Sequence, residues 1–393
     1  MMQLGINNLR FFVTLTLAKM ISFLSPLLGF GNGGVWAGHV ALSIYPELLK
    51  NKRINFPKGL VLVTGTNGKT TTVALIGEIL TAAGFKVTRN KTGANLLNGA
   101  VSAILKDTPL FGDFTSDVGV FEVDELSLPE FLLHMSPKII AFLNLSRDQL
   151  DRAWETDLVL DKWLKALAAA KHPLKLVADS AQPKLQPLIA QFKSLAYLFD
   201  ANPAYLAKTG LKGEFNAKNV NAAVLVTHLL GVVEPVLSAA LAKFAPAYGR
   251  GEVINYNGTA FTLLLAKNPA GFNQNLQSII NGDFTSPALL FMLNDEVRDG
   301  RDVSWIYDID PALLAKACAT AVVYASGRRC WDMAVRLHYA GVPVLAANVL
   351  PLPKQVVNAL VASKVAQVTV LPNYSSMLAL RKILTGREIP PHL

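Results

Sequence analysis

Cysteine is scarce in this chain of 393 residues, which contains only Cys318 and Cys330. Two cysteines cannot build a disulfide framework, and a structural zinc site needs four cysteine or histidine ligands in close pairs. We therefore expect no zinc and a reducing compartment such as the cytoplasm. Charged residues are also few, at 17%, whereas hydrophobic residues reach 51%, which argues against disorder and for large buried cores.

Acidic residues are fewer than basic ones, 28 against 37, so the net charge is +9. This balance favours anionic partners: nucleotide phosphates, nucleic acid or an anionic membrane surface. The sequence lacks the interleaved aromatic and basic residues of a nucleic-acid-binding motif, so we predict no nucleic-acid partner. Internal repeats and low-complexity tracts are also missing.

One long apolar run stands near the N-terminus, "FFVTLTLAKMISFLSPLLGF" at residues 11–30. Its length is about that of a membrane span. However, Lys19 interrupts it midway, and Pro26 and a Gly-rich stretch end it. We expect a helix packed on its own domain, with an interfacial membrane helix and a true span as alternatives.

Short apolar, β-branched runs alternate with helical segments along the rest of the chain. This alternation is typical of α/β domains with parallel sheets. We predict a central ATP-binding domain that with the N-terminal segment spans 1–248, and a smaller Rossmann-like α/β domain at 249–393. Strands are expected at 59–63, 117–125, 139–146, 174–180, 196–201, 287–294, 319–326, 342–349 and 366–372, with a hinge at 247–266.

A glycine-rich turn, "GTNGKTT", lies between the first of these strands and a helix. Its glycines let backbone N–H groups approach phosphate oxygens, and the helix N-terminus favours negative charge. Lys69 would reach the outer phosphates, and Thr70 would bind Mg²⁺. A plain strand-to-helix turn is the alternative, but it gives no reason for Lys-Thr-Thr-Thr. The candidate nucleotide-binding residues are Gly65, Thr66, Asn67, Gly68, Lys69, Thr70 and Thr71.

A phosphate loop needs a metal ligand from a neighbouring strand end. Glu122 in "FEVDE" follows an apolar run and is our candidate Mg²⁺ ligand. A solvated strand-end residue is the alternative. For Asp124 and Glu125 the two interpretations stay open.

These motifs, together with "LNLSRDQLDR", "GEFNAKNVNAA" and "GRGE", resemble the Mur ligase superfamily in their order and separation. The resemblance implies a Mur ligase-like fold that binds ATP and Mg²⁺, with Lys69 and Glu122 as catalytic residues. It further implies that Asn219 and Arg250 belong to the ATP site. Gln149 stands where many members have a metal-binding histidine.

The C-terminal motifs "AKNPAGFN", "NDEVRDGRDVSWIYD" and "LPNYSSMLALRKIL" resemble one branch of this superfamily, the synthetase subunits that pair with a GatD-type glutaminase. The resemblance implies ATP-dependent amidation of the α-carboxylate of D-isoglutamate in the lipid II stem peptide, through an acyl phosphate. This reaction belongs to peptidoglycan biosynthesis at the inner face of the cell membrane. Members of the branch commonly carry a four-cysteine zinc ribbon, which this sequence lacks.

Ammonia supply points to a second polypeptide. Ammonia is mostly ammonium at neutral pH, so amidotransferases release it from glutamine with a Cys/His pair. Neither cysteine here lies in a recognisable glutaminase signature. The resemblance implies that Asp302, the second aspartate of "DGRD", orients the histidine of the partner. Trp305 and Tyr307 are then loop anchors or interface aromatics.

Two other functions remain open. One is a ligase that adds an amino acid, such as a folylpolyglutamate-type enzyme. However, only 64 residues precede Gly65, too few for the UDP-binding domain of amino-acid-adding Mur ligases. The other is a nucleotide-gated, non-enzymatic activator of a glutaminase.

Overall fold

The computed structural model describes residues 2–27, 35–90, 93–112, 114–146, 156–244, 249–297 and 299–387. These residues form two compact units. One unit holds most of the chain up to residue 244, and the other holds residues 210–216 and the chain from residue 249 onward. The "RDQLDR" motif with Gln149 and the expected boundary at residue 248 lie outside the described residues.

The first unit is built on a six-stranded sheet in which every neighbouring pair is parallel. Strands with helices on both faces are buried on both sides, which explains their continuous apolar runs. The short strand β2 was not expected, because three residues give no readable period. The strand order is β2-β3-β1-β4-β5-β6, with bounds β1 Gly59–Thr64, β2 Val87–Arg89, β3 Val118–Glu122, β4 Ile139–Phe142, β5 Lys175–Asp179 and β6 Ala196–Phe199.

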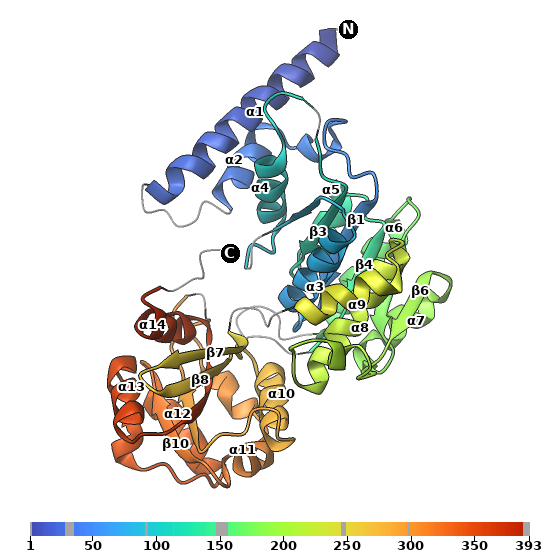
Figure 1. Ribbon diagram of the computed structural model, residues 1–393. Coiled ribbons are helices and arrows are strands. Elements are labelled where there is room, and N and C mark those ends of the chain that lie inside the picture. The colour runs from blue at the N-terminus through green and yellow to red at the C-terminus, as the bar shows by residue number, and fades with distance from the viewer. Residues whose placement is uncertain are drawn as a thin grey trace. The chain divides into compact units, whose positions relative to one another are not determined.

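The helices of this unit connect its strands and cover the sheet (Figure 1). They are α3 Lys69–Ala82, α4 Leu97–Asp107, α5 Leu128–His134, α6 Thr156–Ala169, α7 Gln186–Gln191, α8 Glu214–Leu229 and α9 Glu234–Lys243. Because β1 lies between β3 and β4, the loop after β1 meets the carboxyl ends of both neighbours. This position, where the direction of the strand order changes, is the usual ligand site of a doubly wound sheet.

Two further helices, α1 Met2–Leu27 and α2 Trp36–Ile44, lie beside α4 (Figure 1). Phe11, Leu15 and Ala18 of α1 are buried against this layer. The expected helix packed on its own domain is therefore confirmed. Among the described residues, none of the helices is sufficiently long and apolar to cross a membrane.

The second unit has a mixed sheet, which corrects the expectation of a purely parallel one. Its order is β11-β10-β9-β12-β8-β7, and β7 runs antiparallel to β8. Within the segment 247–266 that was expected to be a hinge, residues 250–264 form a β-hairpin whose turn, Asn257-Gly258, has φ values of 46° and 84°. Asn-Gly is the preferred pair for such a turn, so this signal was present in the sequence.

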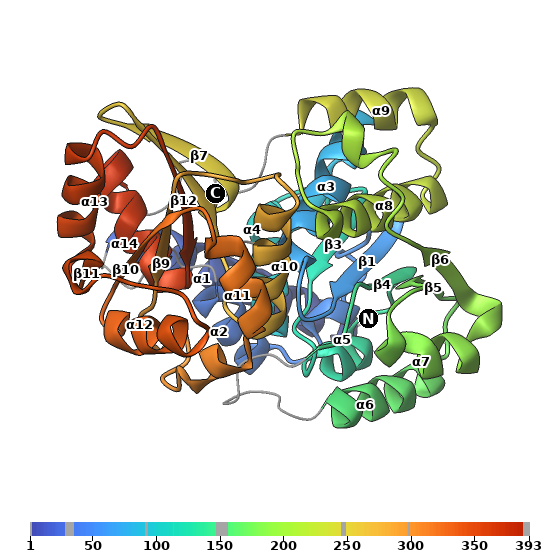
Figure 2. The same cartoon turned by 90° about the horizontal axis from the view of Figure 1, so that it is seen from below.

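The remaining strands of this sheet match the expected ones except at 342–349, where only the last residue joins a short strand. The bounds are β7 Arg250–Tyr256, β8 Thr259–Leu264, β9 Ala288–Met292, β10 Val322–Ser326, β11 Val349–Leu350 and β12 Gln367–Pro372. Leu289 and Phe291 of β9 belong to one apolar cluster, and Leu290 and Met292 belong to another on the opposite face of the sheet. Figure 2 shows helices on both sides of this sheet. Helices α10 Pro269–Ile280, α11 Pro311–Cys318 and α12 Cys330–Tyr339 contribute to one cluster, and α13 Pro353–Ala362 and α14 Tyr374–Thr385 to the other.

Candidate active site

The glycine-rich loop adopts a backbone that only glycine tolerates at two positions. Gly65 and Gly68 have φ values of 132° and 90°. A Cβ atom at Gly68 would lie 2.1 Å from Oδ1 of Asn219, so the side chain of Asn219, in α8, lies directly on the loop. The structure thus brings together the loop and an asparagine that the sequence motifs placed in one site.

A second asparagine, which sequence reasoning missed, also holds the loop. Asn144 follows β4, and its Oδ1 accepts a hydrogen bond from the backbone N–H of Asn67 at 2.9 Å. Its Nδ2 donates to the carbonyl of Asn67, also at 2.9 Å. The backbone N–H of Thr66 donates to the Asn144 carbonyl at 3.2 Å. A polar residue directly after an apolar strand, in "FLNLS", was the available signal.

Lys69 begins α3 and is only 5% exposed. Its Nζ donates to Oε2 of Glu125 at 3.0 Å and to the carbonyl of Thr66 at 3.3 Å, and it also contacts the carbonyl of Gly65. Glu125 is buried as well, and its own carbonyl accepts a hydrogen bond from Nε1 of Trp163 at 2.7 Å. Glu125 is therefore part of the loop's environment and not a solvated strand-end residue.

Glu122 faces the loop from the end of β3. In the sheet it is paired with Val63, and its Oε2 accepts a hydrogen bond from Oγ1 of Thr70 at 2.8 Å. Asn90 fixes its backbone, because the N–H of Glu122 donates to Asn90 Oδ1 at 2.9 Å and Asn90 Nδ2 donates to the Glu122 carbonyl at 2.8 Å. The hydroxyl and the carboxylate are thus adjacent at the head of α3.

The chemistry of this pair fits Mg²⁺, which prefers hard oxygen ligands and keeps positions for phosphates and water. Across the described ranges, no group of three or more His, Cys, Asp or Glu residues could hold a metal by itself. An ion at Thr70 and Glu122 would therefore complete its shell with nucleotide oxygens and water. Thr66 and Thr71 are both buried at 2% exposure and support the loop and the first helical turn.

Arg250 belongs to the other unit, where it begins β7. There it lines a cavity of about 580 Å³ together with Lys212, Glu252 and Thr369. Nearby, the guanidinium of Arg381 forms an ion pair with Glu252, which also accepts a hydrogen bond from the N–H of Gly249 at 2.9 Å.

Asp302 lies on the surface just before a 3-10 turn at Ser304–Asp308. Its Oδ1 accepts a hydrogen bond from the backbone N–H of Ser304 at 2.8 Å, and hydrogen bonding to Ser304 lowers the pKa of the carboxyl. Asp302 is therefore an exposed anion at neutral pH. The two aromatics behind it differ: Trp305 is 2% exposed and packs against Phe272, whereas Tyr307 is 51% exposed. Only Trp305 is an internal anchor.

A buried aspartate fixes the loop that carries Asp302. Asp299 is 2% exposed and accepts hydrogen bonds from the backbone N–H of Ser375, at 2.9 Å, and from its hydroxyl. Burial raises the pKa of Asp299. Next to it, Asn294 and Asn373 exchange hydrogen bonds at the carboxyl ends of β9 and β12. The loop is thereby tied to the middle of the sheet.

The two cysteines have no catalytic environment. Burial raises the pKa of the Cys318 thiol to about 12, and burial also raises that of Cys330, which is fully buried. Both thiols stay protonated at neutral pH. Neither is an accessible nucleophile.

Comparison with known proteins agrees with this architecture. The family model "Mur ligase middle domain" matches residues 63–162, and "MurT ligase C-terminal" matches residues 265–377. Two crystal structures of MurF, from Acinetobacter baumannii and from Thermotoga maritima in complex with ADP, superpose with TM-scores of 0.63 and 0.65. The Acinetobacter structure is 16% identical in sequence, and the alignment covers 88% of this chain and 79% of MurF. The Thermotoga structure is 14% identical, and the alignment covers 88% of this chain and 84% of MurF.

Curated relatives extend over most of the chain. The lipid II isoglutaminyl synthase (glutamine-hydrolyzing) subunit MurT of Staphylococcus aureus strain COL is 29% identical over 86% of this chain and 89% of the relative. The protein of the same name from Streptococcus pneumoniae strain R6 is 24% identical over 91% and 94%, respectively.

The fold and the phosphate loop define a Mur ligase-like protein with a parallel central sheet and a second, smaller α/β unit. Within that class, two findings indicate the group: the match to the MurT C-terminal domain, and the MurT relatives that align along nearly the full length of the chain. The chain belongs to the MurT group.

Proposed function

We propose that the protein is the ATP-dependent synthetase subunit of a lipid II isoglutaminyl synthase. The substrate is the α-carboxylate of D-isoglutamate in the stem peptide. ATP transfers its γ-phosphoryl group to a carboxylate oxygen, which gives an acyl phosphate and ADP. Ammonia then attacks the acyl carbon, phosphate leaves with the bonding electron pair, and loss of one proton gives the amide.

The observation that supports this proposal most is the joint placement of Lys69, Thr70 and Glu122 around one glycine-rich loop. Lys69 would neutralise the outer phosphates, and the loop's backbone N–H groups would orient them. Mg²⁺, when bound through Thr70 and Glu122, would supply charge neutralisation for the transferred phosphoryl group. Asn219, which lies on Gly68, would fix the loop against the nucleotide, and Arg250 is a further candidate ATP contact.

The ammonia source is proposed to be a GatD-like glutaminase subunit. Asp302 is exposed and ionised, so it is available to a partner rather than to a pocket of its own unit. A carboxylate can orient the histidine of a Cys/His pair, as the third member of a triad does. The buried thiols of this chain are consistent with a nucleophile located on another polypeptide.

The surface around Asp302 is suited to a protein partner. Helix α12 exposes Trp331, Val335 and Tyr339 at 55%, 44% and 74%, at a spacing that places them on one face. Tyr307 lies beside this helix, with Arg336 of α12 at 5.9 Å from its ring. Aromatic residues are enriched at protein interfaces, so we propose this face as the glutaminase-docking surface.

Two rival functions make different predictions. A nucleotide-gated activator without ligase activity would not need Lys69 for amidation. An amino-acid-adding ligase would extend the stem peptide by a residue mass instead of exchanging an acid for an amide.

The test is co-expression with a neighbouring glutaminase gene, followed by mass spectrometry of the peptidoglycan stem. We expect a loss of about one dalton, the mass difference between an acid and its amide, and no such loss with Lys69→Ala. A Lys69→Ala complex that still amidates lipid II would support the activator and overturn the ligase. A residue-mass increase would support the amino-acid-adding enzyme.

A further inference from the structure

Helix α1 has apolar side chains on two opposite faces. One face is buried against α2 and α4 through Phe11, Leu15 and Ala18. The opposite face is exposed, although its residues recur every three or four positions, as in a packed stripe. We call it the α1 stripe: Leu9 66%, Val13 44%, Leu17 38%, Met20 52%, Phe23 72% and Leu24 41% exposed.

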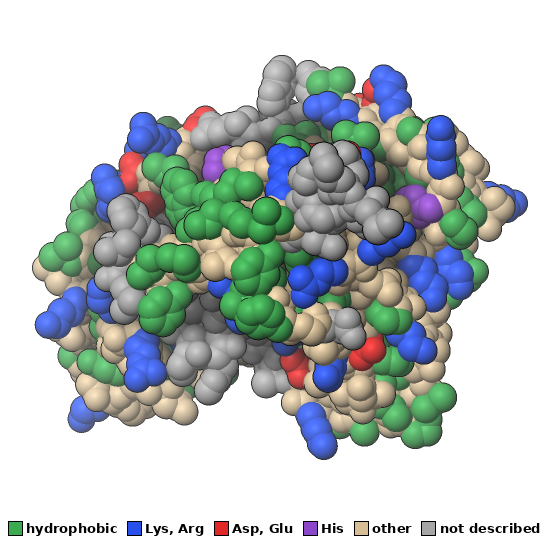
Figure 3. Space-filling model, turned by 90° about the horizontal axis from the view of Figure 1, so that it is seen from above, with side chains coloured by type: hydrophobic (Ala, Val, Ile, Leu, Met, Phe, Trp, Pro, Cys, Tyr) green, Lys and Arg blue, Asp and Glu red, His purple; other side chains and the backbone are tan. Residues whose placement is uncertain are grey.

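Further exposed apolar residues belong to the elements beside α1. Trp36 at the start of α2 is 58% exposed, and Phe111, whose ring lies 5.7 Å from that of Phe12, is 80% exposed. Figure 3 shows hydrophobic side chains gathered on the face seen from this end of the molecule. A contiguous apolar area of this kind marks an interaction site, because scattered single residues are the norm on soluble surfaces.

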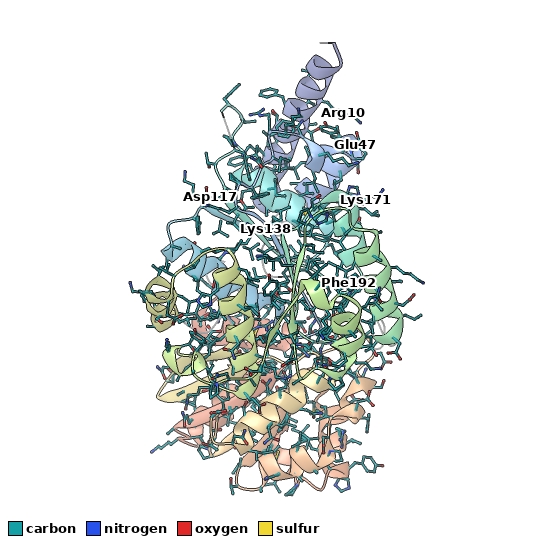
Figure 4. All side chains as sticks on the ribbon, turned by 90° about the vertical axis from the view of Figure 1, so that its right-hand side faces the viewer. Arg10, Glu47, Asp117, Lys138, Lys171 and Phe192 are labelled. Carbon is teal, nitrogen blue, oxygen red and sulfur yellow. The ribbon has the colours of Figure 1, made fainter. Side chains whose placement is uncertain are left out.

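The charges around the stripe select its partner. With 100° of rotation per residue, Arg10 falls on one flank of the stripe and Lys19 on the other. Acidic residues are missing from the sequence before Glu47, and the carboxylate that acts electrostatically on Lys19 is that of Asp107, at the end of α4. Arg10, labelled in Figure 4, donates to the Ile44 carbonyl at 3.0 and 2.6 Å, and Lys19 donates to the Lys106 carbonyl at 3.1 Å. Both cations are thereby held in place.

We propose that the α1 stripe lies on an anionic phospholipid surface, parallel to the membrane plane. An apolar stripe between cationic flanks is the pattern of an interfacial helix, and exposed Trp and Phe are suited to the headgroup region. A second copy of the chain would bring like charges together across the same stripe. The inference deepens the proposed function, because a lipid-linked substrate requires the enzyme to work at a bilayer.

The test is flotation of the full-length protein with phosphatidylcholine vesicles, with and without phosphatidylglycerol. We expect binding to the anionic vesicles that weakens with added salt. The double variant Met20→Glu/Phe23→Glu should reduce the bound fraction by roughly tenfold or more, because both side chains leave the interface. The matched control is Leu133→Glu/Leu158→Glu, at positions 77% and 57% exposed on α5 and α6, which should bind like the wild type.

Three results would overturn the proposal: no binding of the wild type to anionic vesicles, equal binding of the stripe variant and its control, or a stripe variant that changes the oligomeric mass but not vesicle binding. Circular dichroism and the milder Met20→Gln/Phe23→Ala variant, which should bind at an intermediate level, separate a binding defect from misfolding. The assay contains no ATP and no glutaminase. Failure of amidation on detergent-solubilised lipid II would therefore contradict the proposed function and leave the vesicle result standing.

Discussion

From the ion pair between Lys69 and Glu125 we predict that the charge of Glu125 stabilises the fold, which no sequence motif indicated. Both side chains are buried, and their charged atoms are 3.0 Å apart. At an effective dielectric constant of about 20, the attraction across such a distance is about 5 kcal/mol before desolvation is counted. Glu125→Gln keeps a hydrogen-bond acceptor and removes the charge. The loop carbonyls still solvate the ammonium, so the net loss in the free energy of unfolding should be about 2 kcal/mol.

For a domain of this size, that loss lowers the unfolding temperature by roughly 4–8 °C in the absence of nucleotide. Glu125 and the nucleotide phosphates compete for the same ammonium, so the affinity for ATP and Mg²⁺ should not fall in the variant. Differential scanning fluorimetry and calorimetric titration measure the two quantities, with Asp124→Asn as the neighbouring control. An unfolding temperature equal to that of the control would refute the stabilising role. A tenfold loss of ATP affinity would refute the competition.

Three further predictions concern other parts of the molecule. Gly68→Ala should abolish ATP binding measured by calorimetry, because the new Cβ would lie 2.1 Å from Asn219 Oδ1. Gly84 has a similar φ of 86° but nothing within 4 Å of its Cβ position, so Gly84→Ala should bind ATP normally. Trp305→Ala should lower the free energy of unfolding by about 3–5 kcal/mol in urea, but Tyr307→Ala by less than about 0.5 kcal/mol; equal losses would contradict their different burial. Burial raises the pKa of Asp299 above its ordinary value of 3.8, so the folded state holds this proton more tightly than the unfolded state. The free energy of unfolding of the wild type should therefore fall as the pH rises from 3.8 through the raised pKa. Urea titrations at several pH values should show this slope, and Asp299→Asn should remove it.

Most of the fold was predictable because buried parallel strands carry a continuous apolar signal. The runs at 59–63 and 287–294 became β1 and β9 on this basis. The hairpin of β7 and β8 was missed, although Asn257-Gly258 marks its turn. Its strand β7, with the sequence Arg-Gly-Glu-Val-Ile-Asn-Tyr, is partly exposed and has no continuous apolar run. The "GRGE" motif drew attention to a hinge instead.

The candidate site was predictable for residues whose type, at that position, is explained only by ligand binding. Lys69 and Thr70 are examples, because a lysine and a threonine after a glycine-rich turn suit a phosphate and Mg²⁺. Asn90 and Trp163 could not be found in this way, and the only local signal for Asn144 was its position after an apolar run. Their contribution is a hydrogen bond to the backbone of another segment, from 32 to 77 positions away. Such contacts depend on the packing of the whole sheet, which local sequence patterns do not encode.

The central claim is that this chain makes an amide with ammonia from a partner whose active site is completed by Asp302. The most direct measurement is amidation of lipid II by the reconstituted complex, followed by mass spectrometry, with glutamine or with ammonium salt at high pH. Asp302→Asn should lose glutamine-dependent amidation, bind ATP normally and recover activity with free ammonia, whereas Asp308→Asn in the same segment should behave as the wild type. An Asp302→Asn complex that uses glutamine at the wild-type rate, or that free ammonia does not rescue, would contradict the account.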